Sequence, residues 1–106
     1  IIVWKGLLLM KYIQNGTENI VEYEVDETGA MLYACDTEET HILNDTAYFL
    51  YKSLEEPADT EQLYRRMEQV YDIPAEARDS VMSDIRNCLS MLCEKGLVRT
   101  AEERAD

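Results

Sequence analysis

The chain has 106 residues, of which 46% are hydrophobic and 30% are charged, and this indicates one small globular domain with a modest core. No apolar run approaches the roughly 20 residues that a membrane helix needs, so we expect no contact with a membrane. The net charge is −12, with 13 acidic residues against one basic residue, Lys52, between positions 18 and 61. Nucleic acid is therefore disfavoured as a partner, because phosphates attract Lys and Arg.

Residues 1–17 are predicted to be an N-terminal extension. The first nine residues are apolar but short, and they lack a small-residue cleavage site, so no signal peptide is expected. They are either native or the remnant of an upstream segment. The following residues favour a strand, and Asn15-Gly16 is a strong turn signal. This segment either adds a strand to the fold or hangs loose, and exchange of such a strand between two chains would give a homodimer.

Three short strands are predicted next, over residues 19–25, 30–35 and 40–43. In the first strand, polar and apolar residues alternate, which predicts one inward face. The residues expected on that face are Val21, Tyr23 and Val25. Turn-forming residues separate the three segments, so we expect a small three-stranded antiparallel meander.

Two helices are predicted over residues 44–54 and 59–71. Asn44 suits the N-cap of the first helix, because its side chain can accept a hydrogen bond from the first turn. Asp59 and Gln62 have the spacing of a capping box at the start of the second helix. The inward face of the second helix is predicted to carry Leu63, Tyr64, Met67 and Val70.

A third helix is predicted over residues 74–95, with Pro74 in its first turn and Gly96 as its stop. Its core-facing arc carries Val81, Ile85, Leu89 and Leu92. One flank of that arc carries Asp84, Cys88 and Met91, and the other carries Met82, Arg86 and Cys93. A small sheet followed by three helices predicts an α+β fold of the winged helix-turn-helix type over residues 18–99, with a frayed tail over 100–106.

No catalytic centre is expected from these residues. The single histidine, His41, has no neighbouring nucleophile, and the four glycines are isolated, so there is no phosphate-binding loop. The three cysteines, Cys35, Cys88 and Cys93, form no CxxC pair, which disfavours a zinc site. We interpret them as buried thiols in a reducing cytoplasm, and we expect no metal and no cofactor.

Three motifs carry a resemblance to a known family. Residues 43–47, Leu-Asn-Asp-Thr-Ala, are similar to the family's Leu-Asn-x-Thr-Ala at the start of the first helix. Residues 70–74, Val-Tyr-Asp-Ile-Pro, are similar to its Tyr-Asp/Gly-Val-Pro. The closing pattern, which runs from Asp84-Ile85 to Gly96-Leu97, is similar to the family's Asp-Val…Leu…Leu…Gly-Leu. With the spacing kept, the stretch from Val21 to Val98 resembles the PqqD-like family of RiPP recognition elements.

This resemblance implies a protein without catalytic activity of its own. Such a domain binds the leader of a ribosomally synthesised precursor peptide by adding it to a sheet edge, and presents the peptide to a modifying enzyme, commonly a radical S-adenosylmethionine (radical SAM) enzyme. In the family, the third strand forms this edge, and the third helix forms the other wall of the groove that holds the peptide. Carried over, this implies peptide contacts at Thr40, His41, Ile42, Leu43, Met82, Asp84, Ile85, Arg86, Cys88 and Met91.

The sequence pattern leaves two points open. Periodicity does not say whether the flank with Asp84 or the flank with Met82 faces the peptide. Two other functions also fit a winged-helix pattern, namely a regulatory or protein-interaction domain in transcription control, and a part of a larger modifying enzyme. A DNA reader would carry an excess of basic residues on the third helix, but residues 74–98 hold three bases against four acids.

Overall fold

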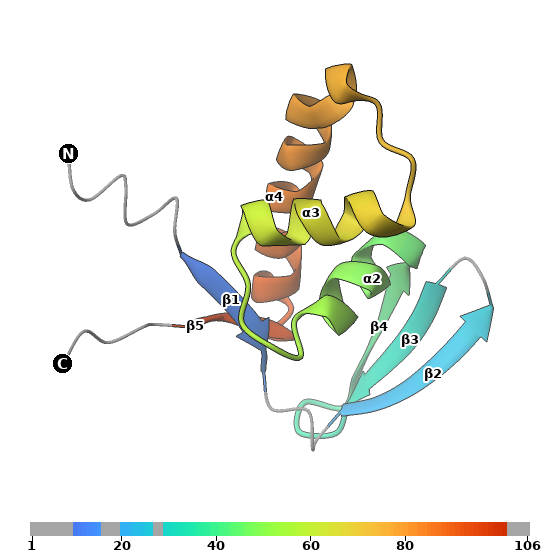
Figure 1. The fold of residues 1–106 in the computed structure, drawn as a ribbon. Coiled ribbons are helices and arrows are strands. Elements are labelled where there is room, and N and C mark those ends of the chain that lie inside the picture. Colours follow the sequence, from blue (N-terminus) through green and yellow to red (C-terminus); the bar gives the residue numbers. More distant parts are fainter. Residues whose placement is uncertain (1–9, 16–19, 27–28, 102–106) are drawn as a thin grey trace, which may run out of the picture.

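The computed structural model describes residues 10–15, 20–26 and 29–101. In chain order, the elements of these residues are β1 (Lys11–Gln14), β2 (Ile20–Asp26), β3 (Gly29–Ala34), β4 (Glu39–Asn44), α2 (Asp45–Ser53), α3 (Thr60–Val70), the short 3₁₀ helix η2 (Ala75–Ala77), α4 (Arg78–Glu94) and β5 (Val98–Ala101). The predicted α+β fold, a three-stranded antiparallel sheet followed by three helices, is confirmed (Figure 1).

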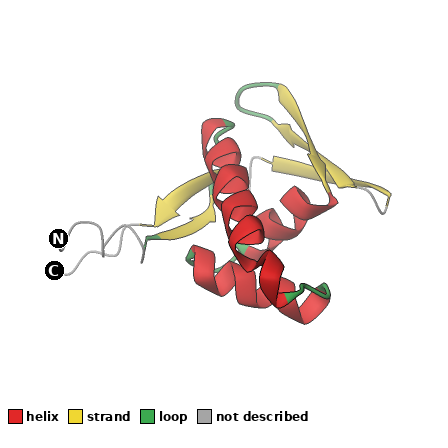
Figure 2. Cartoon of the chain, turned by 90° about the horizontal axis from the view of Figure 1, so that it is seen from above, coloured by secondary structure: helices red, strands yellow, loops and turns green. Residues whose placement is uncertain are grey.

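The strands form two separate sheets, with the helices between them (Figure 2). The larger sheet has the order β2-β3-β4 and is an antiparallel meander. The smaller sheet pairs β1 with β5, so the two ends of the described chain lie side by side (Figure 1). The core contains buried side chains from β3, β4, the three α-helices and β5.

The N-terminal strand is present, but it does not extend the meander. It pairs instead with β5, where Tyr12 lies opposite Thr100. Residues 100 and 101 therefore lie in a strand, and our placement of them in a frayed tail was wrong; residues 102–106 lie outside the described part. The other side of β1 is held by the loop after α2, because Tyr12 and Ala58 exchange two backbone hydrogen bonds of 2.8 and 3.1 Å. The expectations for residues 1–9 also lie outside the described residues.

The inward face of β2 differs from the prediction. Val21 and Tyr23 are 38% and 56% exposed, so they lie on the outer face; the side chain of Val25 is outside the described part. The register explains the difference, because Glu22 lies opposite Leu32, which is fully buried on the side that faces the helices. Glu22 is itself exposed, and its carboxylate accepts a hydrogen bond of 2.9 Å from the Tyr48 hydroxyl on α2.

The predicted helix starts are confirmed in atomic detail. The Asn44 side chain accepts a hydrogen bond of 2.8 Å from the backbone N–H of Ala47. Asp59 and Gln62 form the complete capping box, with reciprocal bonds of 2.8 and 2.9 Å. Both caps depend on residues three apart, which is why the sequence pattern was sufficient.

Two details of the later helices need correction. Val70 does not belong to the buried face of α3; it is the last residue of that helix and is 63% exposed. The third helix does not begin as an α-helix at Pro74, since η2 intervenes and α4 starts at Arg78. Gly96, with a φ of 76°, ends it as expected, in a left-handed conformation that favours glycine.

Candidate functional site

The third strand of the meander, β4, forms one edge of the sheet. It pairs with β3 on one side, and on its other side no backbone group of the described residues makes a hydrogen bond to it. An edge strand of this kind presents a row of N–H and C=O groups that another extended chain can pair with. We refer to this side of β4 as the open edge.

The close approach of Gly29 shows which residues of β4 face the open edge. A Cβ on Gly29 would lie 2.0 Å from the backbone oxygen of Leu43, so the Leu43 carbonyl is directed toward β3. In an antiparallel strand the backbone groups of successive residues point alternately to the two sides. The N–H and C=O groups of Thr40 and Ile42 are therefore directed to the open edge.

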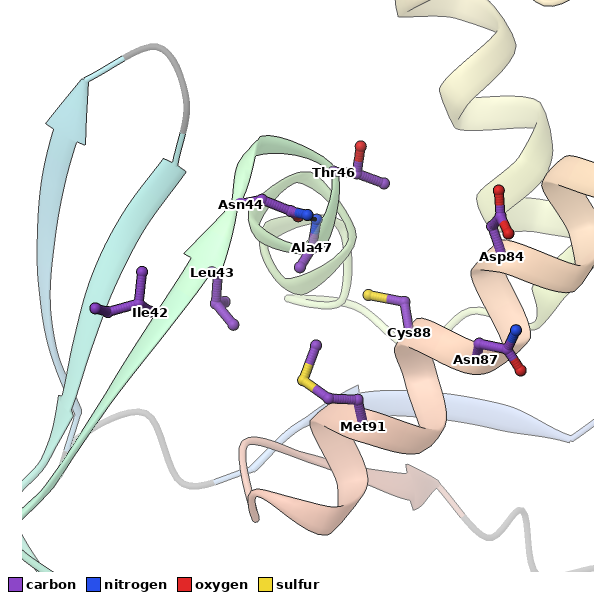
Figure 3. Close-up of a pocket in the computed structure, with 9 residues that line it drawn as sticks. All are labelled: Ile42, Leu43, Asn44, Thr46, Ala47, Asp84, Asn87, Cys88 and Met91. Carbon is purple, nitrogen blue, oxygen red and sulfur yellow. Dashed lines mark hydrogen bonds between the residues drawn. The ribbon is translucent and has the colours of Figure 1, made fainter.

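A groove of about 470 Å³ lies beside the open edge. β4 and the first turn of α2 form one wall, and α4 forms the other (Figure 3). The groove is lined by Ile42, Leu43, Asn44, Thr46, Ala47, Asp84, Asn87, Cys88 and Met91. In Figure 3 the sulfur-bearing side chains of Cys88 and Met91 point from α4 toward the α2 and β4 wall. A flexible thioether suits a wall that must adapt to differing apolar groups.

The groove brings together five of the ten residues that we predicted to contact a peptide: Ile42, Leu43, Asp84, Cys88 and Met91. The side chain of Ile42 is 77% exposed and points away from α4, so this residue contributes its backbone to the groove (Figure 3). The structure thus places the Asp84 flank of α4 beside β4. The role of these five residues in peptide binding stays a prediction.

The other five predicted residues do not line the groove. Thr40 is exposed on β4, and Ile85 is buried in the core, where it lines a second cavity next to the groove. Met82 packs against the core, and Arg86 is exposed; neither lines the groove. Sequence reasoning missed four lining residues, Asn44, Thr46, Ala47 and Asn87. The first three lie at the end of the edge strand and in the first turn of α2, and that position was the available signal.

His41 is buried on the face of β4 that packs toward the helices, opposite Leu32. Its Nε2 atom lies 3.5 Å from an oxygen of Glu39, which is long for a hydrogen bond, and no described residue gives it a hydrogen-bond partner. Its position is that of a buried residue of the sheet.

The three cysteines differ in environment. All are free thiols, and Cys35 is exposed in the turn between β3 and β4, contrary to our expectation of a buried residue. Cys88 and Cys93 are half-buried, and burial raises the pKa of each thiol above its usual value of 9.0. At neutral pH, Cys88 therefore presents the groove with a neutral, weakly nucleophilic group.

We predict that alkylation by iodoacetamide distinguishes these thiols. A raised pKa means that the thiolate fraction of Cys88 is small below pH 9 and keeps growing above it, so its labelling rate rises through that range. Cys35 should be labelled several-fold faster at pH 8. Mass spectrometry of digested protein measures both rates, with Cys35→Ser as the control for assignment. Equal rates for Cys35 and Cys88 at pH 8 would contradict the buried position of Cys88.

The sequence matches the family described as coenzyme PQQ synthesis protein D (PqqD) over residues 29–98. The chain belongs to the PqqD family. The matched region of this PqqD domain begins with β3 and ends in β5, so it includes both walls of the groove. The resemblance carried by the sequence motifs is thereby confirmed.

Two further comparisons extend this result. No curated protein matches the chain. Among solved structures, it is similar to "TbiB1 in Complex with the TbiA(beta) Leader Peptide", with a TM-score of 0.65, 20% identity, and coverage of 86% of this chain and 100% of that one. At this identity the likeness shows a shared fold. None of the described helices is long and apolar enough to span a bilayer.

Proposed function

We propose that this PqqD-family domain binds the leader segment of a ribosomally synthesised precursor peptide as an extra strand on the open edge of β4. The observation that carries the proposal is the juxtaposition of that edge with the groove in front of α4. Backbone hydrogen bonds to Thr40 and Ile42 hold the peptide, and side-chain contacts in the groove select its sequence. The related fold of TbiB1, solved with a leader peptide, supports this arrangement.

The domain itself performs no reaction in this proposal. The only histidine of the sequence is buried, and the groove thiol has a raised pKa, which supports a binding role over a nucleophilic one. The bound precursor is instead presented to a modifying enzyme, which we propose to be a radical SAM enzyme on the strength of the motifs shared with the family. We place this activity in the cytoplasm, where free thiols persist.

Two arginines on α3 and α4 have partners within the protein, which supports a peptide ligand over nucleic acid. Arg78 is engaged by Glu61, with a nitrogen–oxygen distance of 2.7 Å, and its guanidinium lies 5.2 Å from the ring centre of Tyr64. Arg66 donates a hydrogen bond to the backbone of Ser53. Arginines that are occupied in this way offer little to a phosphate backbone, whose binding depends on neutralisation by available cations.

Amide hydrogen exchange tests the strand-addition proposal. The probe is a peptide selected on this protein from a displayed library of random 20-residue sequences, with its affinity first measured by fluorescence anisotropy. We expect the Thr40 and Ile42 amides to exchange rapidly in the unbound protein and to become protected when the peptide binds. The His41 and Leu43 amides, which face β3, should be protected in both states.

The pattern across β4 is the internal control for this experiment. Protection that alternates with residue number identifies an added strand, because only every second N–H faces the peptide. Two results would count against the proposal: selection that yields no peptide binding below about 100 μM, or a bound peptide that leaves the exchange of Thr40 and Ile42 unchanged.

A further inference from the structure

A second cavity, of about 250 Å³, lies next to the groove among α2, α3 and α4. Five apolar side chains line it: Met67, Tyr71, Ile73, Val81 and Ile85. Its two other lining residues, Thr46 and Asp84, also line the groove, so the two spaces share a border. We call this second space the anchor pocket.

One apolar residue of the anchor pocket's lining, Tyr71, is accessible to solvent. Tyr71, which follows α3, is 38% exposed, and its ring packs edge-on against Phe49 with 5.7 Å between ring centres. The Tyr71 side chain thus belongs both to the apolar lining and to the surface, so an apolar group of a ligand that enters the pocket would cover it.

The size and lining of the pocket define what it can accept. At about 250 Å³ it is smaller than the cavities that enclose a whole small-molecule ligand, but it has room for one large side chain. Its inner lining has no charged residue, and the one carboxylate, that of Asp84, lies on the border with the groove. Asp84 is exposed, so it favours a basic residue close to the apolar one.

We propose that the anchor pocket receives one large apolar side chain of the peptide that pairs with β4. This inference rests on the proposed function. A chain that follows the open edge past Asn44 reaches Thr46 and Asp84, the two residues at which the groove meets the pocket. The occupant is therefore a residue such as Leu, Met or Phe, placed at the end of the paired segment and next to a Lys or Arg. Burial of this side chain fixes the register of the peptide on β4.

Three variants test the anchor pocket with the library-selected peptide. Val81→Phe fills the pocket from α4, and Tyr71→Ala removes an exposed side chain from its lining, which the fold should tolerate. Val70→Ala is the matched control, since Val70 is the adjacent exposed apolar residue but does not line the pocket. Each variant is checked for folding by circular dichroism, and affinities are measured by fluorescence anisotropy for the peptide and its single-alanine derivatives.

We expect one apolar peptide position whose replacement by alanine weakens binding roughly 10- to 100-fold, the effect of burying one large side chain. In the Val81→Phe and Tyr71→Ala proteins, the alanine replacement at that peptide position should cost less affinity. In the Val70→Ala protein, it should cost as much as in the unchanged protein. One outcome is that the peptide binds and protects the Thr40 and Ile42 amides, while no peptide position shows an alanine effect that changes in either pocket variant. That result would refute the anchor pocket and leave strand addition standing. If no peptide binds at all, both proposals fall.

Discussion

Replacing Ile42 by proline is expected to weaken binding of the selected peptide by about 10- to 100-fold, while replacing it by threonine should change the affinity by less than about threefold. The N–H of Ile42 is directed to the open edge, whereas its side chain points away from α4 and is 77% exposed. Proline removes that N–H and leaves a peptide carbonyl without its partner. Threonine keeps the N–H and the branched side chain that favours a strand.

The comparison of the two variants separates the contribution of the backbone N–H to the affinity from that of the side chain at position 42. Proline is tolerated on an edge strand where its missing N–H would face away from the sheet, so the Ile42→Pro protein should fold. Thermal unfolding followed by circular dichroism checks this, and fluorescence anisotropy measures the affinities. If neither folded variant loses affinity, β4 is excluded as the docking edge; an equal loss in both would assign the effect to the side chain.

Replacing Gly29 by alanine is expected to lower the free energy of unfolding by about 2 to 4 kcal/mol, which is a large part of the stability of a small domain. The added Cβ would lie 2.0 Å from the Leu43 oxygen and 3.0 Å from the Cα of Asn44, and both are backbone atoms. Neither can rotate away, so β3 and β4 must separate at that point. Urea denaturation measures the change.

Gly96→Ala is the matched control for this prediction. A Cβ on Gly96 meets no atom within 4 Å, but its φ of 76° is left-handed, which costs a non-glycine residue about 1 kcal/mol. Gly29→Ala should therefore be the more destabilising of the two. Since Gly29 pairs with Asn44, the N-cap of α2, separation there should also disturb the groove. A smaller loss for Gly29→Ala than for Gly96→Ala would show that the two strands are not held as closely as described.

Local patterns were sufficient wherever a feature depends on neighbours in the chain. The caps at Asn44 and Asp59 and the helix stop at Gly96 each require residues within one turn, and all three were predicted from the sequence. The order of strands and helices follows for the same reason. The shared motifs of the PqqD family also lie mainly at these helix ends.

Features that depend on distant residues were predicted less well. The alternation in β2 divided its side chains correctly into two faces, but the inward face was set by Glu22, whose partners Tyr48 and Lys52 lie on α2. The pairing of β1 with β5 joins segments more than 80 residues apart. A sequence pattern contains neither the partner nor the register of such contacts.

The strands of the meander, the three α-helices, the α+β class and the family could all be predicted from the sequence, because they depend on periodicity, capping and short motifs. The strand β5 and the 3₁₀ helix η2 could not. The flank of α4 that lies beside β4 became known only from the folded chain, in which Asp84, Cys88 and Met91 line the same groove as Leu43 and Ala47. Periodicity identifies the core-facing arc of a helix, but it does not say which neighbouring element lies beside each flank of that arc. The orientation of α4 is fixed by packing against α2, α3 and β5, which contribute buried side chains to the same core.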